Sequence, residues 1–114
     1  MNNTKWNEIF HAFYYENELK QDHPSVMWRT KDIESGYISD WDGTWTHFGN
    51  ELRNWDKIDY LQIRLTPGNR EFVLRCLKQI HVPGIVEEDI VTVFGYRSGV
   101  DHTIFRFKTI YSSD

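Results

Sequence analysis

The 114-residue chain has a single cysteine, Cys76, which excludes an internal disulfide and leaves no second cysteine to share a metal ion. No apolar run approaches the roughly 20 residues that a membrane-spanning helix requires. Polar residues follow Met1 directly, without the basic region and apolar run of a secretory signal. These absences predict a soluble, cytoplasmic protein with no membrane partner, no metal and no other cofactor.

Positive charge is scarce in the first half of the chain. Residues 1–60 hold 11 acids against 6 Lys or Arg, whereas residues 61–114 hold 6 acids against 7 Lys or Arg. Generic nucleic-acid binding needs clustered positive charge, so this distribution argues against a nucleic-acid partner. It leaves room for a basic protein partner at the acidic half, beside the plainer interpretation of an acidic, soluble surface.

The length fits one domain with one core, and we expect residues 1–114 to form a single domain. Apolar residues at the spacing of an amphipathic helix occur near the amino terminus, at Trp6, Ile9, Phe10, Phe13 and Tyr14. They predict a helix over residues 4–20 with Asn3 or Thr4 as its N-cap. A second stripe predicts a helix that Thr66 or Asn69 caps and Val82-Pro83-Gly84 ends; it comprises Phe72, Val73, Cys76, Leu77 and Ile80.

Two turn signals, Glu34-Ser35-Gly36 and Asp42-Gly43, divide the segment between these helices. If both are tight turns, a meander of three strands follows, at residues 27–34, 37–41 and 44–48. Its register sets Lys31 opposite Asp40, Ile33 opposite Ile38 and Tyr37 opposite Phe48. One face would then carry Ile33, Ile38, Trp45 and His47, and the other Thr30, Asp32, Tyr37, Trp41 and Phe48.

Alternation at period two predicts three more strands. Within residues 56–67, Leu61, Ile63 and Leu65 alternate with polar neighbours, and residues 90–97 and 103–110 read as a closing hairpin. The element order is α-β-β-β-β-α-β-β. The predicted fold class is therefore α+β, a mostly antiparallel sheet of about six strands with two amphipathic helices.

A recognition surface is expected in the tryptophan-rich stretch from Trp28 to Trp55, where four of the five tryptophans are interleaved with acids. Several of these rings must be core, because burying one removes roughly 150 to 250 Å² from water. Trp41 is the best surface candidate, since it lies between two acids beside a turn and could enter a basic groove. The predicted partner-binding residues are Asp32, Glu34, Asp40, Trp41 and Asp42, with Glu87, Glu88 and Asp89 as a second patch. The plainer interpretations are a turn residue for Asp42 and a solvated loop for residues 87–89.

No histidine lies at a recognisable catalytic or metal-ligand spacing, so no catalytic residue is assigned. The ordinary interpretation of His47 is a satisfied, partly buried imidazole, and that of Cys76 a small buried hydrophobe. An enzyme would require a cleft that unites His47, His81 or His102 with an acid.

Four segments resemble an uncharacterised family of small bacterial proteins: Trp28-Arg29-Thr30-Lys31-Asp32, Gly36-Tyr37-Ile38-Ser39, Trp41-Asp42-Gly43 and Ile80-His81-Val82-Pro83-Gly84. The resemblance covers most of the chain and implies a bacterial cytosolic protein, but it brings no catalytic residues. In size, acidity, lone cysteine and mixed layout, the chain also resembles in type the immunity proteins of contact-dependent growth inhibition and other polymorphic toxin systems.

Two functions follow as hypotheses. The first is an immunity protein that binds and neutralises a cognate toxin C-terminal domain, often a basic nuclease, through an acidic surface that contains aromatic residues. The alternative is a small-molecule-binding or regulatory module with an aromatic pocket lined by Trp28, Trp45 and Tyr60. A deep cavity would favour the second function, and a filled core with a flat acidic exterior would favour the first.

Overall fold

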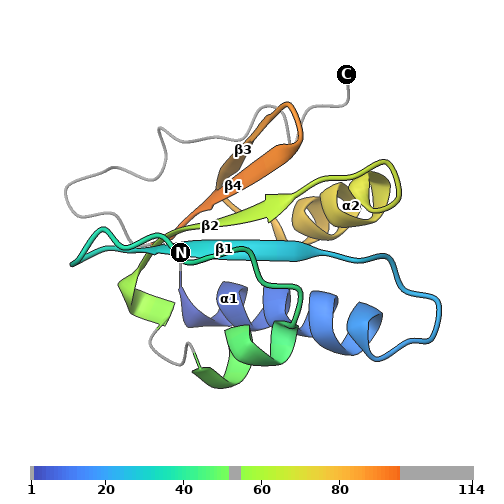
Figure 1. The fold of residues 1–114 in the computed structure, drawn as a ribbon, viewed down its shortest axis with the longest axis horizontal. Helices are drawn as coiled ribbons and strands as arrows, with labels where there is room; N and C mark the ends of the chain where they lie inside the picture. The colour runs from blue at the N-terminus through green and yellow to red at the C-terminus, as the bar shows by residue number, and fades with distance from the viewer. Residues whose placement is uncertain (1, 52–54, 96–114) are drawn as a thin grey trace.

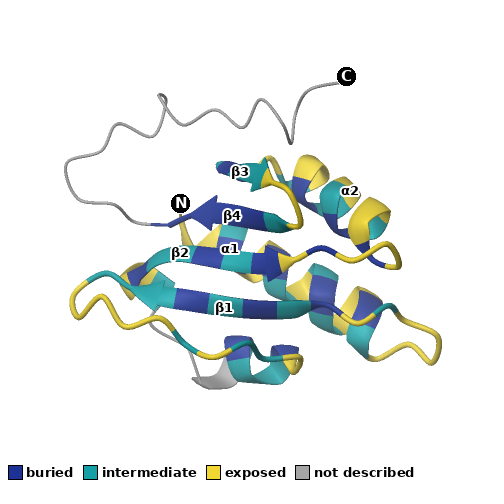
Figure 2. Cartoon of the chain, turned by 45° about the horizontal axis from the view of Figure 1, so that its top comes forward, coloured by how far each residue is buried: buried dark blue, intermediate teal, exposed yellow. Residues whose placement is uncertain are grey.

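The computed structural model describes residues 2–51 and 55–95. Its elements are α1 (Asn3–Phe10), the π-helix η1 (His11–Glu18), β1 (Met27–Asp32), the π-helix η2 (His47–Glu51), the 3₁₀-helix η3 (Trp55–Lys57), β2 (Ile58–Arg64), α2 (Arg70–Ile80), β3 (Gly84–Glu87) and β4 (Ile90–Phe94). The strands form one antiparallel sheet in the order β1-β2-β4-β3. Helices α1 and α2 contact each other behind this sheet (Figures 1 and 2). The result is a two-layer α+β arrangement.

Strand register separates a helix-covered face of the sheet from an outer face. Trp28 pairs with Ile63, which pairs with Val91 across β1, β2 and β4, and all three side chains are buried. Figure 2 shows the resulting alternation of buried and partly buried positions along these strands. On the outer face, the neighbouring row is Arg29, Gln62 and Thr92. Alternation at period two thus assigns apolar side chains to the core and several polar ones to the outer face.

Aromatic rings fill the layer between helices and sheet. Trp45 is 1% exposed, its ring stacks on Phe13 with 4.8 Å between centroids, and it meets Phe48 at 5.3 Å. Its indole N–H donates to the Val26 carbonyl at 3.0 Å, so the polar atom of the ring is satisfied inside the core. The largest fully buried side chains are Trp6, Trp45, Phe13, Phe48, Ile9, Leu61, Ile63, Leu77, Val73 and Val82.

The first predicted helix is confirmed as a helical run over residues 3–18, but its cap and its geometry differ from the expectation. The Asn2 side chain, rather than Asn3 or Thr4, caps the helix by accepting from the backbone N–H of Lys5 at 3.0 Å. From His11 onward the helix is a π-helix. The apolar stripe still faces the core, since Trp6, Ile9 and Phe13 are buried.

The second predicted helix is confirmed as α2, and Asn69 occupies its N-cap position without a side-chain cap bond. The Asn69 amide instead joins three segments, because it donates to the carbonyls of Ser25 and Arg64 and accepts from the backbone N–H of Thr66. His81 ends the helix in the left-handed region at φ 61°. Val82-Pro83-Gly84 therefore follows the helix end as expected.

The predicted three-stranded meander is wrong beyond its first strand. Residues 37–41 make a single isolated bridge to β1, in which Lys31 is opposite Ile38 rather than Asp40, and residues 45–51 are helical rather than extended. The Asp42 side chain accepts from the backbone N–H of Thr44 at 2.7 Å, which forms an Asx-turn just before the helical residues. Phe48 is consequently buried on the core side with Trp45, not on the opposite face.

The sheet has four strands among the described residues, not about six. The predicted strand in residues 56–67 is confirmed as β2 and the one in residues 90–97 as β4, while β3 was not predicted. The predicted strand at residues 103–110 lies outside the described residues. No helix in the described part is long and apolar enough to cross a membrane.

Candidate functional site

Residues 33–42, here called the edge segment, run along the side of β1 that does not pair with β2 (Figure 1). Backbone hydrogen bonds fasten both ends of it to the strand. The N–H of Asp32 donates to the Tyr37 carbonyl at 2.8 Å, and Trp28 and Asp42 exchange two bonds at 2.9 and 2.8 Å. The segment is therefore a fixed loop that covers a strand edge, and its backbone is held in place before any partner binds.

Asp32 holds the turn that opens the edge segment. Its carboxylate accepts from the backbone N–H of Ser35 at 2.8 Å, from the Ser35 hydroxyl at 2.9 Å and from the backbone N–H of Glu34 at 3.1 Å. The bonds from the Ser35 backbone and hydroxyl, followed by that from Glu34 and the charge of Lys57, hold the pKa of Asp32 below its usual value. This carboxylate has a structural task and is a weaker candidate for a partner contact.

The most exposed apolar side chains of the edge segment are Tyr37 and Ile38, with 67% and 43% of their surface accessible. The exposed acids Glu34 and Asp40 lie on either side of them in the chain. Two hollows flank the segment, one of about 460 Å³ and one of about 250 Å³, and Thr30 and Ser39 line both. Sequence reasoning predicted the turn that ends at Gly36, where φ is 77°, but it placed Tyr37 within a strand and did not single out this exposed pair.

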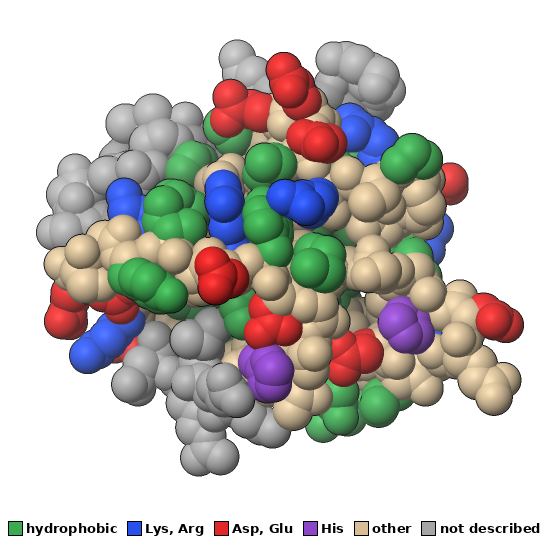
Figure 3. All heavy atoms as spheres, viewed as in Figure 1, with side chains coloured by type: hydrophobic (Ala, Val, Ile, Leu, Met, Phe, Trp, Pro, Cys, Tyr) green, Lys and Arg blue, Asp and Glu red, His purple; other side chains and the backbone are tan. Residues whose placement is uncertain are grey.

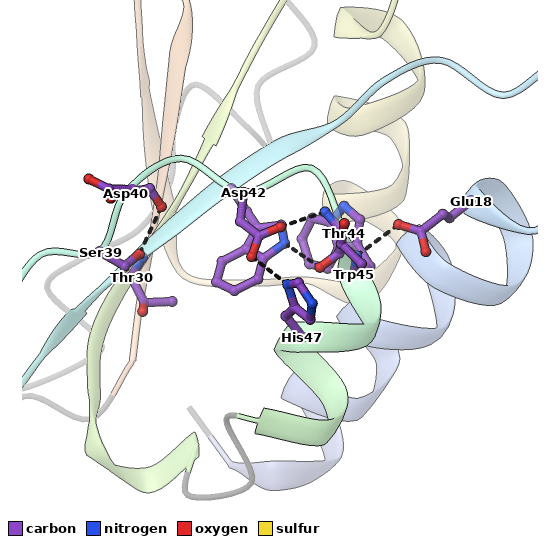
Figure 4. A network of polar contacts seen from close by, with 9 residues as sticks. Glu18, Thr30, Ser39, Asp40, Asp42, Thr44, Trp45 and His47 are labelled. Carbon is purple, nitrogen blue, oxygen red and sulfur yellow. Dashed lines mark hydrogen bonds and ion pairs between the residues drawn. The ribbon is translucent and has the colours of Figure 1, made fainter.

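Asp42 connects the edge segment to the helical turn that follows it (Figure 4). One carboxylate oxygen accepts from Thr44, and the other lies 2.7 Å from Nδ1 of His47, which donates to it. The next residue, Trp45, donates its backbone N–H to the Glu18 carboxylate at 2.8 Å. The plainer interpretation of Asp42, a turn residue, is therefore its main structural role, and His47 is a satisfied imidazole as expected.

The hydroxyl group of Ser39 is not placed to act as a nucleophile for the Asp42–His47 pair. Ser39 is nearby in the chain, but its hydroxyl accepts from the backbone N–H of Thr30 at 3.0 Å and donates to the Asp40 carbonyl at 3.2 Å. Among the residues that the structure describes, no three His, Cys, Asp or Glu side chains are grouped to hold a metal ion. At α2, burial raises the pKa of the half-buried Cys76 thiol, which disfavours a reactive thiolate.

Trp41 lies in a different environment from the acidic one that was expected. The guanidinium carbons of Arg29 and Arg64 lie 4.5 and 4.4 Å from the centroid of its ring, which is half-buried against the outer face of the sheet. Cation–π attraction of this kind fixes the ring in place. The Trp41 backbone lies between acids, but its ring packs against two arginines instead of protruding. Its role in partner binding stays a prediction.

The second predicted patch, Glu87, Glu88 and Asp89, occupies the exposed β3–β4 turn. In Figure 3 acidic side chains gather over this hairpin at the top of the view, and basic side chains gather nearer the middle. Because β1 and β3 are opposite edges of the sheet, the turn and the edge segment form two separate acidic regions. The structure therefore does not bring the predicted partner-binding residues together into one patch.

The expected aromatic pocket lined by Trp28, Trp45 and Tyr60 is not assembled. Trp28 and Trp45 are buried with ring centroids 5.8 Å apart inside the filled core. Tyr60 points to the other face of the sheet, where the Lys31 ammonium lies 5.8 Å from its ring centroid. These three residues cannot line a single cavity.

The chain belongs to a protein family whose description is "Family of unknown function", DUF6678, because residues 1–99 match that family. The expected membership of an uncharacterised family is thereby confirmed. Comparisons with curated proteins and with solved structures gave no match.

Proposed function

We propose that this protein is a cytoplasmic immunity protein, which binds a cognate toxin domain through its edge segment and thereby blocks the toxin. The observation that carries the proposal is the adjacent pair Tyr37 and Ile38, exposed on a loop whose backbone is fastened to β1. Exposed large apolar side chains rimmed by polar ones are typical of protein-binding surfaces. Tyr is also among the residue types that most often dominate binding energy.

Charge supports a basic partner. The edge segment holds the acids Glu34, Asp40 and Asp42 and no Lys or Arg. The nearby Lys57 offsets Glu34 in part, since its ammonium lies 3.6 Å from the Glu34 carboxylate in an exposed ion pair of small energetic value. A local negative field of this kind accelerates encounter with a basic surface, such as that of a nuclease, and favours it over acidic competitors.

Rigidity supports the same proposal. A loop that must be ordered on binding loses conformational entropy at that moment, whereas the edge segment is already held by backbone bonds at both ends and by the Asp32 turn. The hollow of about 460 Å³ beside Tyr37 gives a partner side chain a place to enter. Tyr37 and Ile38 would therefore contribute most of the binding free energy, and Glu34, Asp40 and Asp42 would mainly raise the association rate.

The test is binding of the purified full-length chain to the toxin-like domain encoded beside its gene, measured by isothermal titration calorimetry. Tyr37→Ala should weaken binding by about 30-fold, the level expected of a dominant interface residue. Leu19→Ala is the matched control, because Leu19 is exposed to 60% but lies on the helical side of the molecule. Absence of a complex at micromolar concentration, or equal losses in the two variants, would contradict the proposal.

The alternative function is a small-molecule-binding or regulatory module, and the same hollow favours it. Its volume of about 460 Å³ falls within the range of ligand sites, and its lining combines Lys31, Lys57 and Tyr37. Binding of a small ligand in this hollow would be weakened by Lys57→Ala and would not require a protein partner. A screen of metabolites by thermal shift, with Lys57→Ala as the specificity check, separates this function from the first.

A further inference from the structure

We propose that Arg29, Trp41 and Arg64 form a binding site for a phosphate group on the outer face of the sheet. The inference does not depend on the proposed partner of the edge segment, because it rests on Arg29 and Arg64 and on the Trp41 ring packed against them, not on Tyr37 and Ile38. Arg29 and Arg64 come from neighbouring strands, β1 and β2, whose register places both on this face. The Trp41 ring brings their guanidinium groups together.

The two positive charges are close, and neither is paired with an acid among the described residues. Each guanidinium carbon lies within 4.5 Å of the same ring centroid, so the distance between them cannot exceed the sum of the two separations. The two guanidinium groups are therefore closer together than the Debye length of about 10 Å at 0.1 M salt. Because of this, salt only partly screens the repulsion between their charges. Neither arginine forms an ion pair with any residue that the structure describes. An anion between them would relieve this repulsion.

The donors are oriented before a ligand arrives. Arg29 uses Nε to donate to Oε1 of Gln62 at 2.7 Å, and Gln62 in turn donates to the Thr92 hydroxyl at 3.1 Å. This chain of bonds crosses three strands and leaves the two terminal nitrogens of the Arg29 guanidinium for another acceptor. The Arg64 side chain makes no hydrogen bond to a described residue. Planar guanidinium groups with free terminal nitrogens suit oxyanions.

Charge matching favours phosphate over carboxylate. Two guanidinium groups carry a charge of +2, and a phosphate monoester carries about −1.5 to −2 at pH 7. A carboxylate would compensate only one of the two arginines. The three terminal oxygens of a phosphate monoester also allow both arginines a two-point contact when they share one oxygen. The ligand class is therefore a phosphate group, either as the free ion or as a monoester.

The experiment is a titration of the ¹⁵N-labelled full chain with inorganic phosphate at pH 7.5 and constant ionic strength, repeated with phosphoserine, acetate and sodium chloride. The indole signal of Trp41 is identified by its loss in Trp41→Phe. We expect a saturable shift with phosphate or phosphoserine, with a dissociation constant on the order of 1 mM, and a markedly smaller shift with acetate. A lower dissociation constant for phosphoserine would identify the monoester as the source, and equal constants the phosphate group itself.

Phosphate should also raise the melting temperature of the unaltered chain. Arg64→Gln should weaken binding at least tenfold and reduce this rise. The matched control is Arg75→Gln, because the Arg75 guanidinium lies over another ring, that of Phe72, at 5.8 Å, away from the sheet face. It should leave the phosphate response unchanged. A shift that does not saturate, a shift that chloride or acetate reproduces, or equal behaviour of the two variants would overturn the proposal.

Discussion

Asn69 is a buried polar residue for which the structure predicts in detail how a substitution changes the free energy of unfolding. The side chain is 1% exposed and joins three segments. Its amide nitrogen donates to the carbonyls of Ser25 at 2.8 Å and Arg64 at 3.1 Å, and its amide oxygen accepts from the backbone N–H of Thr66 at 2.8 Å. The loop before β1, the end of β2 and the start of α2 therefore depend on one side chain.

Asn69→Ala removes these three hydrogen bonds. At about 1 kcal/mol of net stability for each, the free energy of unfolding should fall by about 3 kcal/mol. Asn69→Asp keeps the shape but replaces the donor by a second oxygen, which at pH 7 faces two carbonyl oxygens as a buried charge. The loss should be larger, about 4 kcal/mol or more, since an unpaired buried charge adds to the missing bonds.

Urea unfolding followed by far-UV circular dichroism measures both losses, with an unchanged slope as evidence that the folded state stays compact. The carboxyl group in Asn69→Asp should have a raised pKa in the folded state. Its penalty is therefore complete above that pKa and disappears as the pH falls toward the unfolded value of about 3.9. Asn7→Asp, at an exposed position of α1, should change stability by less than about 0.5 kcal/mol. If Asn69→Asp is no worse than Asn69→Ala at pH 7, or its deficit does not depend on pH, the reasoning about the amide donors is refuted.

Three further predictions concern the core, the turn and a glycine. Trp45→Ala should lower the free energy of unfolding by about 3 to 5 kcal/mol in the same urea assay, because the ring is fully buried among other rings; a loss below about 1 kcal/mol would contradict the packing. The Asp32 carboxylate, whose pKa is lowered from 3.8, contributes stability that is present above that value and lost as the pH falls through the lowered pKa; Asp32→Asn should remove this pH dependence, and an unchanged acid profile would count against the turn. Gly95→Ala should destabilise by about 2 kcal/mol or more, since a Cβ would strike the Ile58 carbonyl, whereas Gly68→Ala, with only an ordinary contact at 3.8 Å, should be nearly neutral in thermal denaturation.

Helices and the central strands could be predicted because their patterns are local. Trp6 and Ile9 repeat at helical spacing, Leu61 and Ile63 at strand spacing, and burial follows those periods. The strand predicted for residues 44–48 was wrong because two local signals compete at Asp42. Asp-Gly is typical of a hairpin turn, yet an Asp side chain can also form an Asx-turn by accepting from the backbone N–H two residues on. The structure shows such an Asx-turn, and it leads into helical residues. The spacing from Trp45 to Phe48, three residues apart and both buried, was the evidence for a helix.

The candidate site could be predicted only in part, because its assembly depends on which strands are neighbours. The predicted meander made residues 37–41 the partner strand of residues 27–34, whereas β1 pairs in full with β2. That pairing brings Arg29 next to Arg64, a residue 35 positions later in the chain, and no local pattern reveals it. The β3 strand was missed because it is only four residues long and directly follows Pro83.

The position of Trp41 changes what the acidic stretch can do. If its ring protruded between Asp40 and Asp42, the same residue would anchor a basic partner, and one surface would serve one function. The ring instead lies over the sheet face with two arginines, while Tyr37 and Ile38 are exposed on the edge segment. Under the two proposals, the acidic edge segment and the pair of arginines on the sheet face are adjacent surfaces of opposite charge. A partner that covers both must be basic where it meets the edge segment and anionic where it meets the arginines, and this alternation restricts partners more than acidity alone.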